Sequence, residues 1–155
     1  LEASPCIISY SDIIYHSSGV SSLIDSAEEI AITYDPQWHV LWKKRFTDPL
    51  SDAETFRSEN GKLKEIGNTP TALEQIQGQY MGLFKITPEG FASIKTYLAT
   101  LESRTIKKLD MTALFSQLLN QGIEIGCTPY RFPWFEIDSV YDLQIANEAP
   151  PLTAL

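Results

Sequence analysis

The sequence has few cysteines, few basic residues and no long apolar run. Its two cysteines, Cys6 and Cys127, lie far apart in apolar strand-like segments, so we expect buried free thiols in a cytoplasmic protein rather than a disulfide framework. No stretch approaches the roughly 20 apolar residues that cross a bilayer. The first residues also lack the basic start and small-residue cleavage site of a secretory signal. The sequence therefore predicts no membrane partner. Because residue 1 is Leu rather than Met, we expect translation to begin upstream.

Basic residues are outnumbered by acidic ones. Twelve Lys and Arg stand against 20 Asp and Glu, which gives a net charge of −8. A nucleic-acid backbone is bound through a basic face that displaces counterions, so nucleic acid is not an expected partner. The short basic groups at 43–45 and 107–108 could still meet a small phosphorylated ligand. We interpret Arg45 as a surface cation more readily than as a phosphate ligand.

Several familiar catalytic patterns are also absent. The sequence contains no paired cysteines at zinc spacing, no Ser-His-Asp or Cys-His arrangement, and no glycine-rich loop that would hold phosphates. His16 and His39 are isolated, without partners at metal-ligand spacing, so we interpret both as structural or surface residues. Carboxylates and aromatic side chains remain as the candidates for chemistry.

Strand-like and helix-like segments alternate along the 155 residues, a length sufficient for one domain with a sizeable core. Pro36 could occupy a first helical position, Asn60-Gly61 predicts a hairpin turn, and Ser139 with Asp142 predicts a capping box. We expect strands at 5–12, 29–35, 78–86, 123–130 and 134–138, a hairpin over 53–67, and helices over 19–25, 36–46, 88–101, 110–122 and after 139. This alternation favours an α/β layered fold with a mixed sheet. We expect one domain over 1–148 and a tail or linker over 149–155.

Two carboxylates follow strand-like segments. Asp12 comes after "CIISYS" and Asp138 after "WFEI", at positions where α/β sheets bind ligands beyond their strand ends. Two converging carboxylates would suit Mg²⁺, which takes one or two protein carboxylates together with phosphate oxygens. The alternative is that Asp12 ends a strand and Asp138 caps a helix. Spacing alone leaves both interpretations open.

Aromatic residues near strand ends provide a second candidate feature. They are Tyr10, Trp38, Trp42, Tyr80 and Trp134. Aromatic faces beside a carboxylate can enclose a quaternary ammonium group. The alternative for each of these residues is an ordinary place in the core.

Seven segments occur in an informative order. They are "IISYSDIIY", "IAITYDPQWHVLWKKRF", "DPLSDAETFR", "EIG", "GQYMGLFKITPEGF", "LDMTALFSQLLNQG" and "WFEIDSVYDLQIA". Together they resemble the phosphocholine-cytidylyltransferase-like branch of the nucleotidyltransferases, a group that includes sugar-phosphate and choline-phosphate enzymes. The resemblance covers nearly all of residues 5–148. It implies a Rossmann-like fold of the glycosyltransferase-A type.

The resemblance also implies a reaction. A Mg²⁺-dependent enzyme of this kind joins a nucleoside triphosphate, here CTP, to a small phosphorylated acceptor such as phosphocholine or a phosphonate, and releases pyrophosphate. The acceptor phosphate attacks the α-phosphorus in line, so the protein positions reactants and neutralises charge. By resemblance, Asp12 and Asp138 match the two catalytic, metal-binding aspartates, and the ion would offset the desolvation of Asp12. The candidates for the acceptor pocket are Trp38, Tyr80, Met81, Gly82, Trp134 and Glu136. Asp52 and Glu54 look like signature residues, although a capping box of Ser51 with Glu54 explains them equally.

The sequence departs from the family at its start. The first strand of the family and its glycine-rich triphosphate loop have no counterpart, so we expect a C-terminal portion that lacks the N-terminal nucleotide-binding strands and is inactive alone. The exposed edge of its first strand would invite pairing with another chain or with a second copy in a homo-oligomer. Two alternatives stay open: a sugar-1-phosphate nucleotidyltransferase, and a non-catalytic binding or assembly module.

Overall fold

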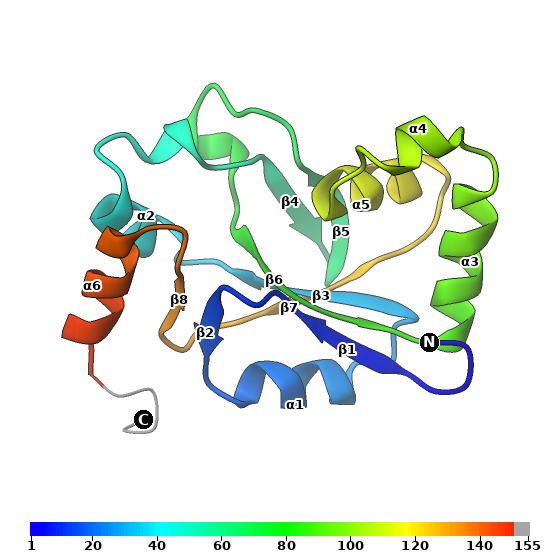
Figure 1. Ribbon diagram of the computed structural model, residues 1–155, viewed down its shortest axis with the longest axis horizontal. Helices are drawn as coiled ribbons and strands as arrows, with labels where there is room; N and C mark the ends of the chain where they lie inside the picture. The colour runs from blue at the N-terminus through cyan, green and yellow to red at the C-terminus, as the bar shows by residue number, and fades with distance from the viewer. Residues whose placement is uncertain (151–155) are drawn as a thin grey trace.

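The computed structural model describes residues 1–150 and shows a mixed sheet with helices on both faces (Figure 1). The strands are β1 (Cys6–Ser9), β2 (Ile13–Tyr15), β3 (Ile30–Asp35), β4 (Phe56–Glu59), β5 (Lys62–Ile66), β6 (Gln79–Ile86), β7 (Gly126–Pro129) and β8 (Trp134–Glu136). The helices are α1 (Ser18–Asp25), α2 (His39–Arg45), α3 (Pro88–Leu98), α4 (Ser103–Ile106), α5 (Met111–Asn120) and α6 (Val140–Glu148), with short 3-10 turns η1 (Pro49–Ser51) and η2 (Leu73–Gln75). The predicted α/β class with a mixed sheet is confirmed.

Six strands form the main sheet in the order β1-β6-β3-β7-β5-β4. The β3–β7 pair is parallel, and the other neighbours in this sheet are antiparallel. The remaining strands, β2 and β8, form a separate antiparallel ribbon in which Ile13 lies opposite Glu136. This ribbon brings the segment after β1 beside the segment that follows β8, although about 125 residues separate them in the chain.

Local sequence signals account for most element boundaries. The hairpin between β4 and β5 turns at Asn60 (φ 51°) and Gly61 (φ 74°), a left-handed pair that an Asn-Gly turn adopts at low cost. The Thr87 hydroxyl accepts a hydrogen bond from the Gly90 N–H and begins α3. At the start of α6, Ser139 and Asp142 form the predicted capping box.

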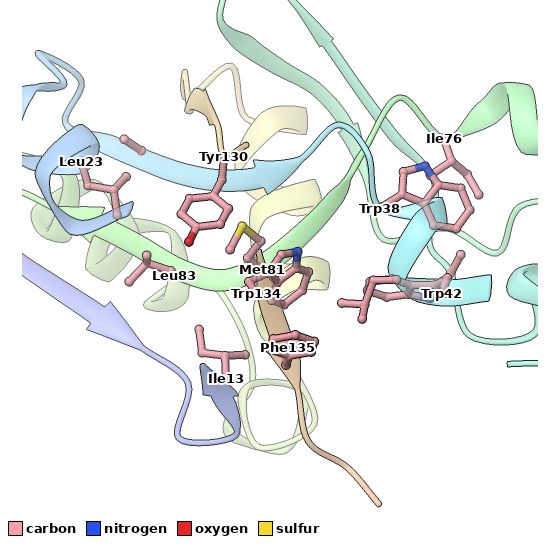
Figure 2. Packing of buried hydrophobic residues seen from close by; sticks show 13 residues of the cluster. Ile13, Leu23, Trp38, Trp42, Ile76, Met81, Leu83, Tyr130, Trp134 and Phe135 are labelled. Carbon is pink, nitrogen blue, oxygen red and sulfur yellow. The ribbon is translucent and has the colours of Figure 1, made fainter. Parts of the chain in front are cut away.

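The sheet separates two hydrophobic clusters. On one face, Phe84 and Ile86 of β6 pack with apolar residues of α3 and α5. On the other face, Met81 and Leu83 of the same strand pack with Leu23 of α1 and with apolar residues of α2 and the β2–β8 ribbon (Figure 2). Alternate residues of β6 therefore supply both cores, because successive side chains of a strand point to opposite faces.

Several local predictions were wrong. Pro36 is not the first helical residue, because α2 begins only at His39. The helix after Thr87 ends at Leu98, before Leu101. Asp12 does not end the first strand, because β1 stops at Ser9. It lies in the turn directly before β2, a strand that was not predicted.

Three other predictions concern the cysteines, membrane-spanning helices and the C-terminal tail. Cys6 and Cys127 are free as predicted, although Cys6 is only partly buried. None of the helices in residues 1–150 has the length and hydropathy needed to cross a membrane. The predicted tail over 149–155 lies outside the described residues from 151 onward.

Candidate active site

A cavity of about 330 Å³ lies between the main sheet and the end of the β2–β8 ribbon. Its lining comes from the loop after β1, helix α2, the segment before β4, strand β6, the start of α5, the last residue of β8 and the segment that follows it. Two kinds of side chain dominate this lining: five carboxylates (Asp52, Glu54, Asp110, Glu136, Asp138) and three aromatic rings (Tyr10, Trp42, Tyr80). No Lys or Arg from the described residues lines the cavity. The arrangement is suited to a positively charged ligand.

The carboxylates are crowded and partly removed from water. Burial raises the pKa of Glu54, and the neighbouring charges of Asp110 and Asp52 act in the same direction. A hydrogen bond from the Thr112 hydroxyl, with an oxygen–oxygen distance of 3.2 Å, offsets part of this effect. Burial also raises the pKa of Glu136 above its ordinary value. A bound cation would relieve both the desolvation and the repulsion between these charges.

Two polar groups of the cavity wall make no hydrogen bond of standard geometry among the described residues: the buried indole N–H of Trp42 and the buried hydroxyl of Tyr80. The carboxylate of Asp52 lies near the first and the hydroxyl of Tyr10 near the second. Trp42 is only 3% exposed. Burial raises the pKa of Tyr80 well above its ordinary value, so its phenol stays protonated and can donate. Since buried donors are rarely left unsatisfied in native proteins, each of them could turn from this neighbour to a ligand.

Gly82 lets the loop after β1 approach strand β6 closely. Its φ is +75°, and a Cβ there would lie 2.6 Å from the ring of Tyr10. The Tyr10 N–H donates to the Gly82 carbonyl at 2.9 Å, and the rings of Tyr10 and Tyr80 meet edge to face with centroids 5.9 Å apart. Gly82 therefore permits close packing of the chain's own aromatic side chains against β6.

Arg45 binds two of the carboxylates that line the cavity but does not line it itself. Its interpretation as a surface cation was wrong, because its side chain is only 1% exposed. The guanidinium binds three carboxylates, from Glu136, Asp138 and Asp142, at nitrogen–oxygen distances of 2.5, 2.7 and 2.9 Å. The sequence shows only a run of basic residues, and burial of the third follows from packing against residues more than 90 positions away.

The predicted acceptor-pocket residues divide into two groups. Tyr80, Gly82 and Glu136 line the cavity, together with the predicted catalytic Asp138. Three others lie in the core cluster on the α1 face of the sheet and do not line it: Trp38, Met81 and Trp134 (Figure 2). The indole N–H of Trp134 donates to the buried carboxylate of Asp35 at 2.9 Å, which gives this tryptophan a structural partner.

Asp12 lies near the cavity but outside its lining. It is exposed, so the predicted desolvation cost of this carboxylate was wrong. Its carbonyl accepts a hydrogen bond from the Ile137 N–H at 2.8 Å, which places its backbone beside the residue that precedes Asp138. The two aspartates predicted from sequence are thus brought to one end of the β2–β8 ribbon.

The protein groups alone do not form a complete metal cage. Within residues 1–150, no cluster of three or more His, Cys, Asp or Glu side chains could hold a metal ion. Mg²⁺ takes one or two carboxylates and completes its shell with water and phosphate oxygens, so Asp12 and Asp138 stay candidates for holding it. Oδ1 of Asp138 receives no hydrogen bond from the described residues and is free for such a role.

Among the carboxylates of the cavity, sequence reasoning missed one and left two undecided. Asp110 was predicted only as the start of a helix, and its carboxylate caps that helix by accepting from the Ala113 N–H at 2.7 Å. It also lines the cavity, and capping hides that second position from the sequence. Asp52 and Glu54 line the cavity as well. The Ser51 hydroxyl donates to the Asp48 carbonyl at 2.6 Å rather than forming a capping box with Glu54.

Comparisons with known proteins agree with this architecture. No family model matches the chain. It is 33% identical over 153 residues to the CTP:phosphoglutamine cytidylyltransferase of Campylobacter jejuni subsp. jejuni serotype O:2, and the match covers 95% of this chain and 60% of that protein. Its structure is similar to the inositol-1-phosphate CTP transferase from T. maritima, with a TM-score of 0.66, 15% identity, and coverage of 92% of this chain and 52% of the other. A candidate glucose-1-phosphate thymidylyltransferase from Bacillus anthracis, solved with sucrose, gives a TM-score of 0.62, 17% identity, and coverage of 93% and 53%.

The curated match confirms the resemblance to cytidylyltransferase-like nucleotidyltransferases, and the solved structures confirm the Rossmann-like fold that it implied. The chain spans 60% of the curated relative and about half of each solved protein. The two solved structures are distant in sequence, so they bear on the fold and not on the ligand.

Proposed function

We propose that the protein containing this chain is a nucleotidyltransferase that uses CTP and a small phosphorylated acceptor, and releases pyrophosphate. The observation that carries this proposal is the 33% identity to a curated cytidylyltransferase, which extends over 95% of the chain. The acidic cavity supports it, because it lies at the end of the ribbon that bears both candidate metal-binding aspartates.

The cavity favours an acceptor with a positively charged group. Its wall combines five carboxylates with the rings of Tyr10, Trp42 and Tyr80. A cationic amine is attracted both by carboxylates and by aromatic faces, and the attraction is strongest where water is excluded. Phosphocholine, an aminoalkyl phosphonate, and an amino-acid phosphate such as the phosphoglutamine named for the relative all belong to this class.

The reaction requires a phosphate oxygen of the acceptor to attack the α-phosphorus of CTP. One P–O bond forms as the bond to the bridging α–β oxygen breaks, and pyrophosphate leaves with that electron pair. Asp12 and Asp138 would hold Mg²⁺, which when bound neutralises negative charge on the phosphates. Glu54 and Glu136 would attract the cationic end of the acceptor, while the buried donors of Trp42 and Tyr80 would bind its polar atoms.

A sugar-1-phosphate acceptor is the second candidate. The buried donors of Trp42 and Tyr80 favour it, because sugar hydroxyls would accept hydrogen bonds from both. The same wall carries five carboxylates, which can accept hydrogen bonds from hydroxyls but gain most from a positive charge.

The test is pyrophosphate release by the full-length protein with Mg²⁺ and a panel of nucleotides and acceptors. We expect turnover with CTP and an amine-bearing phosphate or phosphonate. Turnover only with sugar 1-phosphates would retain the reaction and reject the cationic acceptor. No turnover with any pair would reject the enzyme in favour of a binding or assembly module.

The metal assignment has a separate test in the same assay. Asp12→Asn and Asp138→Asn should each reduce pyrophosphate release by at least about a hundredfold, because each removes a charge expected at the ion. Asp25→Asn is the matched control, since Asp25 is an exposed residue at the end of α1, remote from the cavity. Activity of either test variant within a few-fold of wild type would refute the assignment.

A further inference from the structure

Arg45 differs from the two lysines beside it on α2. Lys43 and Lys44 are exposed, whereas the Arg45 side chain is almost completely buried. Its guanidinium lies over the rings of Trp42 and Phe46, with its central carbon 5.2 and 4.9 Å from their centroids. A buried charge is retained in a fold only when its surroundings compensate the loss of water.

Three carboxylates provide that compensation, each through a different nitrogen. Nε donates to Asp142, Nη1 to Glu136 and Nη2 to Asp138. The guanidinium is planar and rigid, so three simultaneous hydrogen bonds fix the relative orientation of all three acceptors. This geometry joins α2 to the end of β8 and the start of α6.

Asp142 anchors the group. Its Oδ1 accepts from Arg45, while its Oδ2 accepts from the backbone N–H and the hydroxyl of Ser139 at 2.9 and 2.7 Å. Its side chain is 7% exposed and does not line the cavity. Both of its oxygens are therefore committed within the protein, so it can orient Arg45 but is not free to bind a ligand.

Glu136 and Asp138 are held differently. One carboxylate oxygen of each accepts a hydrogen bond from Arg45. The second oxygen of each receives no hydrogen bond from the described residues. Both side chains line the cavity, and they are 26% and 55% exposed. Arg45 thus holds each carboxylate by its inner oxygen and leaves the other oxygen available to a ligand.

We infer that Arg45 is a positioning residue of the active site: fixed by Asp142, it holds Glu136 and Asp138 so that each presents one free oxygen to the cavity. This inference rests on the proposed function for the identity of the bound species, a divalent cation at Asp138 and the cationic end of the acceptor at Glu136. Arg45 itself does not line the cavity, so it acts only through these two carboxylates.

The test compares lysine and arginine at this position. Arg45→Lys preserves the positive charge, but a single ammonium group cannot reproduce the planar, three-way arrangement. With Mn²⁺ as the probe, measured by the electron paramagnetic resonance signal of the free ion, the full-length variant should bind about ten-fold more weakly than wild type. Arg57→Lys is the matched control, because Arg57 is exposed and its ion pair with Glu65 has a nitrogen–oxygen distance of 4.0 Å.

A purely structural role for Arg45 predicts a different result. If the substitution only loosened the fold, extra metal would not restore activity selectively. If Arg45 positions Asp138, saturating Mn²⁺ should recover most of the activity of Arg45→Lys but not that of Asp138→Asn. Should Arg45→Lys fail to fold, Asp142→Asn is the second variant, since it disturbs Arg45 without altering a residue that lines the cavity. It should weaken Mn²⁺ binding in the same direction.

Two outcomes would overturn the inference: Mn²⁺ affinity of both folded variants equal to wild type, or an equal loss in Arg57→Lys. Failure of the proposed function gives a different pattern. The wild-type protein would then show no turnover with any nucleotide, while Arg45→Lys still lowered Mn²⁺ affinity relative to Arg57→Lys. That pattern would reject the reaction but support Arg45 as the residue that positions the carboxylates.

Discussion

Replacing Arg45 with methionine isolates the energetic role of the buried guanidinium. Methionine preserves much of the aliphatic volume that packs on Trp42 and Phe46 but removes the charge and all three hydrogen bonds. The carboxylates of Asp142 and Glu136 would then remain in a largely buried place without their cation. We expect a large loss of stability from these two groups.

The magnitude follows from the exposure of each partner. Removing one member of a buried ion pair costs about 3–5 kcal/mol, because the remaining charge is neither solvated nor paired. The rule applies once to Arg45, the cation shared by Asp142, with 7% exposure, and Glu136, with 26%. Asp138 is 55% exposed and can be solvated, so it adds only about 0–1 kcal/mol. We expect a decrease of about 3–5 kcal/mol in the free energy of unfolding, which a domain with a total of about 5–15 kcal/mol can survive.

The assay is urea unfolding at neutral pH, followed by far-ultraviolet circular dichroism. Arg57→Met is the control, since its exposed ion pair predicts a change of about 0–1 kcal/mol. The double variant Arg45→Met/Asp142→Asn should be more stable than the sum of the single changes, because it also removes the orphaned charge. A loss for Arg45→Met below about 1 kcal/mol, or equal to that of the control, would refute the reasoning.

Three further predictions concern single residues. Gly82→Ala should lower the free energy of unfolding by more than the roughly 1–2 kcal/mol expected for a left-handed backbone, because the new methyl group would lie 2.6 Å from the ring of Tyr10. A Cβ at Gly61 would meet open space, so Gly61→Ala should show the cost of the left-handed backbone alone. Equal losses of unfolding free energy for the two variants in urea would contradict the close contact between Gly82 and Tyr10. Burial raises the pKa of Glu54 in the folded protein above its value in the unfolded chain. Above this folded pKa the charged carboxylate lowers the free energy of unfolding, and the penalty is relieved as the pH falls and the group takes up a proton. Glu54→Gln should therefore raise thermal stability at about pH 8 and have no effect at about pH 3, and a loss at the higher pH would show that the charge is stabilising. Burial raises the pKa of the Cys127 thiol to about 12, so a thiol-reactive chromophore should label this residue only after unfolding, and rapid labelling in the native state would contradict its burial.

The helix starts and the hairpin turn were predictable because they depend on near neighbours. The carboxylate of Asp110 accepts from an N–H three residues later, and the Asn60-Gly61 pair sets its own backbone angles. Hydrophobic residues also repeat at helical spacing in α5, where Leu114, Phe115 and Leu118 are all buried. Such signals act within one or two turns of chain, so a single sequence contains them completely.

The ribbon and the wall of the cavity were not predictable in this way. Strand β2 has only three residues and forms by pairing with β8, more than 100 positions away. Trp38 and Trp134 were candidates for a ligand pocket with the core as the alternative, and only packing placed them in the core. Which aromatic rings face a cavity depends on how separate elements meet, and that contact has no local signature.

By itself, the sequence determined the α/β class, the caps and turns, and the resemblance to nucleotidyltransferases, because each depends on local patterns or on ordered motifs. The tertiary structure determined the burial and the partners of the charged side chains. It buried Arg45 among Glu136, Asp138 and Asp142, and it gathered carboxylates from distant segments into one cavity. The physical reason is that the energy of a charge depends on its solvation and on its partners, and both are set by residues remote in the chain.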